Sequence, residues 1–377
     1  MDKFRHYNMW DEKKKSLGYT SVARKKIHSR EIKSQACPRL EISSRVSTRP
    51  DTAELTLSRK AFIFHYPIGR GGFGRVWKVE MRKNHQFFAM KEMEKIRIVS
   101  KRSVHSVINE RSILETLKNP FIVNMCFAFQ DRENLYLVMD LMPGGDLRYH
   151  IGKQKFFLES QVKFFVACII SGLEYIHNNG IIHRDIKPEN LVFDSKGYLR
   201  ITDFGIARVW NPENSKDTSG TPGYMAPEVI CRQNHTFAVD YFALGVILYE
   251  LMIGRRPYVG RDRKEIRDQI ISRQAKIKPN CIPIGWSFEA VDFVNKLLQR
   301  KPSYRIGYRG ASEVKEHPWL RDFNWDSMYI GALAAPFVPN NEDNFDARVA
   351  GEFRDELDMT IQLDNIQSLF EDYFYVQ

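Results

Sequence analysis

The sequence predicts an α+β protein of two lobes, a small lobe built from β-strands and a larger lobe that is mainly helical. Strand-like alternation of apolar residues begins at Phe62, and a loop at Leu141–Asp146 breaks the chain after a buried strand. Further on, the segment Val239–Met252 is hydrophobic on nearly all sides, which is typical of a central helix. With 377 residues and 43% hydrophobic content, the chain can bury a large core and divide into two or more packed units.

The first part of the chain, residues 1–60, is predicted to be a basic, flexible N-terminal arm. It carries 15 Lys and Arg against 7 Asp and Glu and shows little apolar periodicity. Residues 341–377 are the opposite, with 2 basic and 10 acidic side chains. A peripheral contact of the arm with an anionic membrane competes with the simpler hypothesis of a solvated tail. The net charge of +11 requires no nucleic acid partner.

The cysteines and the apolar runs indicate a soluble protein of the cytoplasm. Five cysteines form no CxxC pair and have no histidine at zinc spacing, so neither disulfides nor a zinc site is expected. The longest apolar run, Phe242–Leu248, is far shorter than the roughly 20 residues of a membrane span. The N-terminus has neither the apolar stretch of a signal peptide nor a glycine for myristoylation.

A glycine-rich stretch lies near the start of the small lobe. Gly69, Gly71 and Gly74 satisfy the spacing GxGxxG, which alone is a weak signal because dinucleotide-binding folds share it. In those folds the glycines open a helix, whereas here they lead into the strand Val76–Val79. We therefore interpret the stretch as a hairpin whose backbone N–H groups close over phosphates.

Lys91 and Glu110 are predicted to form a buried ion pair. Lys91 ends the apolar strand 87–91, where its cation can meet the phosphates of a nucleotide. Glu110 lies in the helical pattern Val104–Leu117, on the same face as apolar residues. A carboxylate on that buried face would be costly without a partner. A surface ion pair between Glu110 and Arg111 is the alternative.

The stretch His183–Asn190 carries the chemistry of the chain. It places a carboxylate, an ammonium and a carboxamide at Asp185, Lys187 and Asn190, and its proline excludes a continuous helix. Asp203 begins an Asp-Phe-Gly triplet thirteen residues after Asn190. Carboxylate and carboxamide oxygens are suited to Mg²⁺, and a carboxylate held in a loop can accept a proton from a hydroxyl.

Together these motifs resemble the catalytic loop and the metal-binding Asp-Phe-Gly of protein kinases. The resemblance implies the bilobal protein-kinase fold, with a small antiparallel β-sheet lobe and a larger, mainly α-helical lobe. The small lobe includes helix C, which is the predicted helix Val104–Leu117 that carries Glu110. It places the kinase domain at 61–320, with the small lobe at 61–140 and the large lobe at 141–320. ATP and Mg²⁺ are the implied cofactors, and proteins are the implied substrates.

The resemblance also assigns roles to single residues. Asp185 would orient an acceptor hydroxyl and take its proton, and Lys187 would damp the charge of the transferred phosphoryl group. Asn190 and Asp203 would hold the metal, while Lys91 and Glu110 would complete the catalytic set. The residues expected around the nucleotide are Ile68, Gly69, Gly71, Gly74, Val76, Ala89, Lys91, Met139, Asp140, Met142, Asp146, Glu189, Val192, Thr202 and Asp203.

Finer features resemble the AGC group of serine/threonine kinases. Lys187 and the Gly-Thr-Pro at 220–222 are typical of serine and threonine acceptors. Residues 321–377 resemble the C-terminal extension of that group, in which Phe345 would touch the nucleotide site. The segment Met139–His150 and Asn324–Asp326 are similar to the "yet another novel kinase" (YANK) branch. A monomer that phosphorylates Ser or Thr of protein substrates is implied.

The resemblance extends to substrate choice and to one structural ion pair. Asp146, Glu189 and Glu250 match positions by which the group attracts arginines, so basic residues are expected before the acceptor. Glu228 is expected to pair with Arg305 as a structural salt bridge.

Two departures from the AGC pattern concern regulation. Asp217 stands where an activation-loop threonine is usual, and we expect its carboxylate to meet Arg184 and Arg208. Near the C-terminus, Phe370 and Tyr373 are expected to dock beside helix C on the small lobe, although the usual phosphorylation position after them is a phenylalanine.

Two other classes of protein compete with an active kinase. A pseudokinase-like scaffold would keep the fold without useful turnover, and the presence of Lys91, Asp185 and Asp203 disfavours it. A dinucleotide-dependent oxidoreductase is opposed by the strand that follows the glycines.

Overall fold

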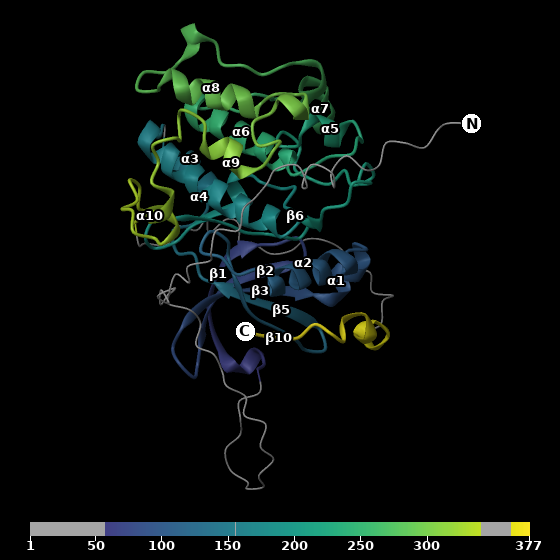
Figure 1. Cartoon of the computed structure of the whole chain (residues 1–377). Helices are drawn as coiled ribbons and strands as arrows, with labels where there is room; N and C mark the ends of the chain where they lie inside the picture. Colours follow the sequence, from purple (N-terminus) through teal and green to yellow (C-terminus); the bar gives the residue numbers. More distant parts are fainter. Residues whose placement is uncertain (1–56, 155, 341–362) are drawn as a thin grey trace, which may run out of the picture. The chain divides into compact units, whose positions relative to one another are not determined.

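The computed structural model describes residues 57–154, 156–340 and 363–377, which belong to one compact unit, Cys37–Gln377. The predicted arm up to residue 56 and the predicted nucleotide contact of Phe345 lie outside the described residues. Within the described ranges, a lobe built on a β-sheet is followed by a lobe of helices (Figure 1). The predicted two-lobed α+β fold is confirmed.

The small lobe is organised by a six-stranded sheet in the order β1-β2-β3-β5-β4-β10, in which all neighbouring strands are antiparallel. One sheet face buries an aromatic cluster, where the Phe62 ring stacks on Phe129 and meets Phe88 edge-on. Such pairs add to the stability that burial of their area gives. The strands are β1 (Phe62–Arg70), β2 (Gly74–Met81), β3 (Phe87–Glu94), β4 (Met125–Gln130), β5 (Asn134–Asp140) and β10 (Tyr375–Val376).

Two helices complete the small lobe, α1 (Lys95–Ser100) and α2 (Val104–Thr116). The buried face of α2 carries Glu110 and Leu114, as the periodicity predicted. The helix ends one residue earlier than expected, because Leu117 takes an extended backbone conformation. Helix α2 thus directs a carboxylate towards β3 from a buried position.

The large lobe is helical and contains two small two-stranded sheets after its second helix. One sheet pairs β6 (Ile181–Ile182) with β9 (Arg208–Val209), and the other pairs β7 (Leu191–Phe193) with β8 (Leu199–Ile201). Side chains of Asp146, Asp262, Ser287 and Asn324 cap four helices by accepting hydrogen bonds from their first-turn N–H groups. The helices are α3 (Leu147–Lys153), α4 (Glu159–Asn178), α5 (Pro227–Ile230), α6 (Ala238–Ile253), α7 (Arg263–Ser272), α8 (Phe288–Leu297), α9 (Ala311–Lys315) and α10 (Trp325–Tyr329).

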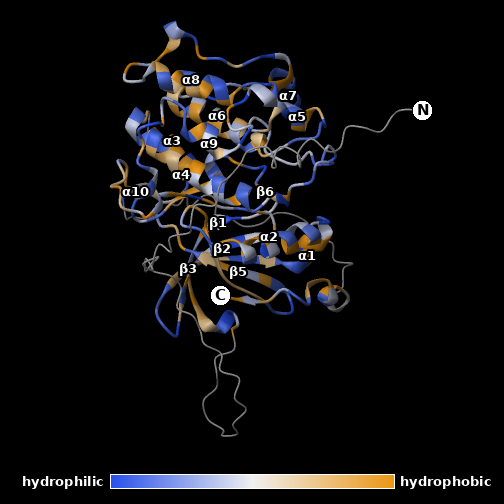
Figure 2. Ribbon diagram, viewed as in Figure 1, coloured by the Kyte–Doolittle hydropathy of each residue, from blue (hydrophilic) through white to orange (hydrophobic). Residues whose placement is uncertain are grey.

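Helix α6 is the centre of this lobe. Nearly all its residues are buried, and Figure 2 colours much of α4 and α6 orange, for hydrophobic residues. At Gly245 a Cβ would approach the Cβ of Leu297 in α8 to 2.8 Å, so the glycine allows the two helices to pack closely. The helix ends at Gly254, whose positive φ of 77° is easy only for glycine. The prediction of a central helix at 239–252 is confirmed.

The end of the chain returns to the small lobe, as the sequence predicted. Phe370 and Tyr373 are 0% and 1% exposed, and the Nε2 of Gln130 donates to the Phe370 carbonyl at 2.5 Å. Arg111 of α2 donates to the Phe374 carbonyl at 2.7 Å. The next residues form β10, which pairs with β4 and was not predicted. This C-terminal segment, residues 366–377, therefore contacts both the sheet and α2.

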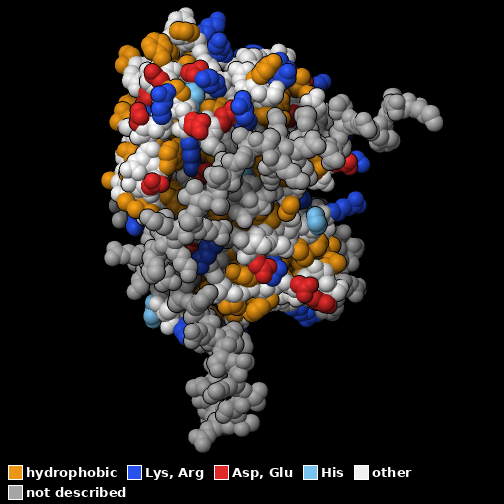
Figure 3. Space-filling model, in the orientation of Figure 1, with side chains coloured by type: hydrophobic (Ala, Val, Ile, Leu, Met, Phe, Trp, Pro, Cys, Tyr) orange, Lys and Arg blue, Asp and Glu red, His pale blue; other side chains and the backbone are white. Residues whose placement is uncertain are grey.

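A buried ion pair ties α5 to the end of the large lobe. Two guanidinium nitrogens of Arg305 lie 2.7 and 3.0 Å from the carboxylate oxygens of Glu228, and both side chains are almost fully buried. The expected structural salt bridge is confirmed. Among the helices of the described residues, none combines the length and the apolar character that crossing a bilayer requires. On the face drawn in Figure 3, acidic and basic side chains lie intermixed over the large lobe.

Candidate active site

The carboxylate of Asp185 is held by its neighbours in the loop between β6 and β7. The Nζ of Lys187 lies 2.6 Å from one oxygen, and Thr221 donates its hydroxyl to the other at 2.6 Å. Lys187 also donates to the Thr221 hydroxyl at 3.0 Å. The amide nitrogen of Asn190 donates to the Asp185 carbonyl at 2.9 Å. The structure thus brings together the three predicted residues of the loop and adds Thr221, to which the sequence analysis gave no catalytic role.

Asp240 of α6 fixes the backbone of this loop. Its carboxylate accepts hydrogen bonds from the N–H groups of His183 at 3.0 Å and Arg184 at 2.8 Å, and from His177 at 2.8 Å. Burial would raise the pKa of Asp240, but these partners more than offset it, and the pKa lies below its ordinary value. Asp240 was not predicted, although an acid within an apolar helix was the available signal.

Lys91 forms the predicted pair with Glu110. Its Nζ lies 2.8 Å from Oε1 and 3.0 Å from Oε2 of Glu110, and 3.8 Å from Oδ1 of Asp203. Burial would lower the pKa of Lys91, but the two carboxylates outweigh it and raise the pKa above its ordinary value. The alternative pair with Arg111 is wrong, because Arg111 instead meets Glu115 at 3.1 Å.

Two glycines of the hairpin between β1 and β2 differ in how closely other atoms approach them. A Cβ on Gly71 would lie 3.7 Å from the Cε of Lys91, so the loop backbone passes close to the lysine stem. A Cβ on Gly74 would lie 1.8 Å from the carbonyl oxygen of Glu92, where β2 pairs with β3. The requirement for glycine at 74 is therefore set by strand pairing, which the sequence analysis had not considered.

The residues expected around the adenosine part of a nucleotide come from both lobes. In the small lobe, Ala89 of β3 lies opposite Met139 of β5. In the large lobe, Val192 of β7 forms an isolated bridge with Asp146, and Asp146 caps α3 through the Tyr149 N–H. The other expected residues lie on β1 (Ile68, Gly69), on β2 (Val76), at the end of β5 (Asp140), in the segment after β5 (Met142) and in the 3-10 helix η2, Pro188–Asn190 (Glu189).

Asp203 is held in an unusual backbone conformation beside the catalytic loop. Its φ is 63°, in the left-handed region that residues with a Cβ rarely adopt. The N–H of Thr202 donates to the Asn190 carbonyl at 3.0 Å, which places the two expected metal ligands on adjoining segments. Phe204 is buried, with its ring 5.0 Å from the ring of His183. The local packing thus positions the Asp203 carboxylate towards Lys91.

Asp217 meets one of its two expected partners. Its Oδ2 lies 3.3 Å from Nη1 of Arg184, whose side chain is 4% exposed. Burial lowers the pKa of Arg184, and the Asp217 carboxylate opposes that shift. The expectation for Arg208 is wrong, because its guanidinium instead donates to the Ala207 carbonyl. The ion pair links the activation segment, defined as residues 203–228, to the residue before Asp185.

Glu189 and Glu250, which were expected to receive an arginine of the substrate, are already paired with Arg148 of α3. The Nε of Arg148 lies 2.9 Å from Glu189, and its Nη1 and Nη2 lie 2.8 and 3.0 Å from the two oxygens of Glu250. Arg148 was not predicted as their partner, because it is 102 residues from Glu250 in the sequence and no local pattern links the two residues.

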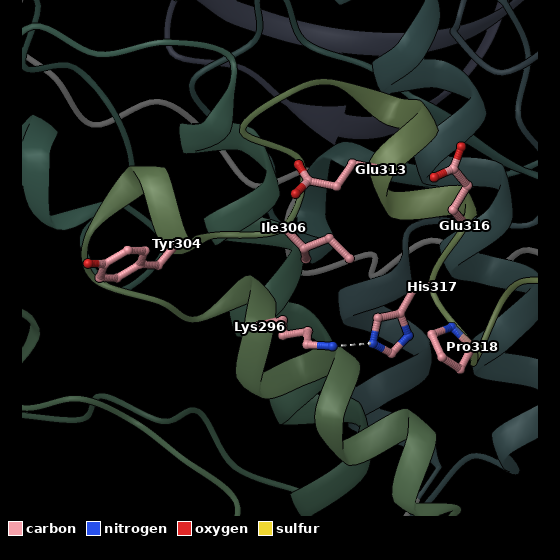
Figure 4. Close-up of a pocket in the computed structure, with 7 residues that line it drawn as sticks. All are labelled: Lys296, Tyr304, Ile306, Glu313, Glu316, His317 and Pro318. Carbon is pink, nitrogen blue, oxygen red and sulfur yellow. Dashed lines mark hydrogen bonds between the residues drawn. The ribbon is translucent and has the colours of Figure 1, made fainter.

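A cavity elsewhere in the large lobe is lined by α8, by Tyr304 and Ile306 between α8 and α9, by α9 and by the segment after α9 (Figure 4). Lys296 points towards His317, with 3.5 Å between their nitrogens, and Glu313 and Glu316 also line the cavity. No residue predicted for the active site lines this cavity.

Comparisons with known proteins agree with this geometry. A family described as the protein kinase domain matches residues 62–320. The chain is 37% identical over 321 residues to a probable serine/threonine-protein kinase of Dictyostelium discoideum, covering 83% of this chain and 69% of that protein. It is 37% identical over 304 residues to the serine/threonine-protein kinase sgk-1 of Caenorhabditis elegans, covering 79% and 64%.

A third relative is the cAMP-dependent protein kinase catalytic subunit of Dictyostelium discoideum, which is 34% identical over 313 residues. That alignment covers 81% of this chain and 47% of the relative. The matches therefore span between about half and about seven tenths of the length of these curated relatives.

Proposed function

From the premise that the chain belongs to the protein kinase family, as a serine/threonine kinase of the AGC group, we propose that it transfers the γ-phosphate of ATP to Ser or Thr hydroxyls of proteins. The observation that carries the proposal is the arrangement around Asp185, whose carboxylate lies 2.6 Å from the Lys187 ammonium. A base and a cation so placed suit a reaction in which a hydroxyl loses its proton and receives a negatively charged phosphoryl group.

In this mechanism Asp185 orients the acceptor hydroxyl and takes its proton as the new P–O bond forms and the bond from the γ-phosphorus to the β,γ-bridging oxygen breaks. The Nζ of Lys187 lies beside Asp185 and Thr221, where its charge can stabilise the equatorial oxygens of the phosphoryl group. Thr221 keeps the base in one orientation through its hydroxyl and its N–H. Alignment and charge neutralisation are the main demands of phosphoryl transfer.

The residues present also fit ATP and Mg²⁺. Lys91, fixed by Glu110, is a cation suited to the α- and β-phosphates beneath the loop at Gly71. Asn190 uses its amide nitrogen on Asp185, so its oxygen is available to a cation, and Asp203 supplies a carboxylate. The bound metal would neutralise charge on the β- and γ-phosphates.

The test is transfer of labelled phosphate from ATP to a peptide panel. Asp185→Asn should retain nucleotide binding and lower kcat by roughly 10² to 10⁴-fold, because an amide cannot take the hydroxyl proton. Asp322→Asn, the same chemical change at an exposed position, is the matched control and should keep wild-type kcat. Unchanged kcat in Asp185→Asn would remove Asp185 from the mechanism.

The proposal extends to the compartment, the oligomeric state and the choice of substrate. The cytoplasm is the proposed compartment, consistent with free thiols at all four cysteines of the described residues. We also propose a monomer, and we keep the YANK branch as a prediction. The expected preference for basic residues before the acceptor depends on Glu189 and Glu250. Because Arg148 already binds both carboxylates, it competes with a substrate arginine for them.

A further inference from the structure

The guanidinium of Arg148 is nearly saturated by groups of its own chain. Nε meets Glu189, Nη1 and Nη2 form a bidentate pair with Glu250, and Nη2 also donates to the Tyr224 hydroxyl at 2.5 Å. Bidentate charge-assisted pairs are among the stronger side-chain interactions. The two carboxylates thus have their guanidinium partner without any substrate.

The groups bound to Arg148 come from the loop that carries the proposed base and from the segment that hydrogen-bonds to it. Glu189 lies in the same loop as Asp185, four residues after it, in the 3-10 helix η2. Tyr224 lies three residues after Thr221, which donates to the Asp185 carboxylate. Arg148 is therefore held between two segments that both reach the proposed base.

The cluster is also reachable from solvent. The side chain of Glu189 is 44% exposed and that of Arg148 is 31% exposed, whereas that of Glu250 is only 9% exposed. Without the Arg148 side chain, a half-exposed and a buried carboxylate would stand together with no cation bound to both. A peptide arginine is a ligand of matching charge and fork geometry for such a site.

We propose that Arg148 occupies, from within the chain, the acidic subsite of Glu189 and Glu250 that a substrate arginine would otherwise enter, and thereby suppresses selection for arginine there. The inference rests on the proposed kinase function and identifies Arg148 as a specificity-determining residue. A substrate arginine must displace a bidentate pair to enter, and the enzyme gains little from that exchange.

The experiment uses the full chain and serine peptides that differ only in one arginine, moved through the five positions before the acceptor. Its readout is the ratio of kcat/KM for each arginine peptide to that for the alanine peptide. For wild type, we expect a ratio near one at the position that faces Glu189 and Glu250. In Arg148→Ala the ratio at one position should rise roughly tenfold or more, as expected for a gained charge-assisted pair.

Lys153→Ala is the matched control, because it removes one positive charge from the same helix, and the Lys153 Nζ lies over the Tyr149 ring, 4.3 Å from its centroid. Its ratios should equal those of wild type. Arg148→Gln keeps hydrogen-bond donors towards Glu250 and serves if Arg148→Ala does not fold. Peptide binding measured by fluorescence polarisation should show the same gain without turnover.

The outcomes separate the two ideas. Equal ratios in wild type and both Arg148 variants would overturn the inference while leaving the kinase function intact. So would a wild type that already selects arginine strongly and loses that selection in Glu250→Gln. A wild type that phosphorylates no peptide would overturn the proposed function, and the inference with it.

Discussion

Asp240 illustrates, at the scale of a residue, how one buried carboxylate can organise a catalytic loop. It accepts two backbone N–H groups and His177, and its folded-state pKa lies below the ordinary value of 3.8. A lowered pKa means that the ionised group stabilises the folded state at pH values above the unfolded pKa. That stabilisation is lost as the pH falls from about 3.8 towards the folded value.

We therefore expect Asp240→Asn to destabilise the protein at neutral pH by about 1–3 kcal/mol, the typical cost of leaving buried donors poorly paired. The variant should also lose part of the acid sensitivity below about pH 4. Urea unfolding from about pH 6 to about pH 3 measures both effects. Asp268→Asn, on an exposed position of α7, is the control, and equal unfolding curves for both variants would contradict the assignment.

The sequence predicted individual residues where a local pattern exposed them. Lys91 follows an apolar run and Glu110 lies on an apolar helical face, so each was expected to need a partner, and the pair followed. Arg148 and Thr221 had no such signal, because their partners are 102 and 36 residues away. Pairings of this kind are set by tertiary packing and can be read only from the folded chain.

Among the elements, the C-terminal segment has a measurable role in holding α2. Phe370→Ala should cost about 3–5 kcal/mol of unfolding free energy, the usual range for a buried Phe. It should also lower activity, since the segment bonds to Arg111, next to Glu110 in α2. Phe374→Ala is the matched control, because that ring is 57% exposed. Melting temperature and kcat together test this, and similar losses in both variants would argue against specific docking.

The activation segment provides a second prediction at this scale. Asp217→Ala should lower kcat several-fold by removing the ion pair with Arg184, while changing stability by less than about 1 kcal/mol, because the carboxylate is half exposed. Glu213→Ala, an exposed acid in the same segment, should leave kcat unchanged. Phosphatase-treated enzyme and Thr218→Ala should retain activity. If dephosphorylation abolishes activity that Asp217→Ala keeps, the carboxylate does not hold the segment.

Elements with a clear local pattern were predicted: α2 and α6 from their apolar periodicity, and the glycine hairpin from its motif and the strand that follows it. Strand β10 was not predicted, because two residues carry no alternation and its pairing with β4 accompanies the burial of Phe370 and Tyr373. The strands of the sheets β6–β9 and β7–β8 have only two and three residues, which is too short for a periodic signal.

For the whole molecule, the two lobes together supply the proposed nucleotide site. Mg²⁺ with ATP should therefore raise the melting temperature, with a stabilisation of about 2.7 kcal/mol at 100 times the Kd. Asp203→Ala should lose the part of this gain that requires Mg²⁺, and EDTA should remove the same part from wild type. Thermal unfolding with ATP alone and with Mg²⁺ and ATP measures both. An Mg²⁺-dependent gain that persists in Asp203→Ala would exclude this residue as a ligand.

The strand β10 has one more consequence, for the behaviour of the protein at high concentration. A sheet that ended at β4 would offer free N–H and C=O groups to another chain, and such edges are templates for aggregation. Tyr375 and Val376 pair with Ala128 and Phe127, and the Gln377 N–H donates to the Cys126 carbonyl, so these positions of the edge are covered. The segment that braces α2 thereby also protects the solubility of the folded chain.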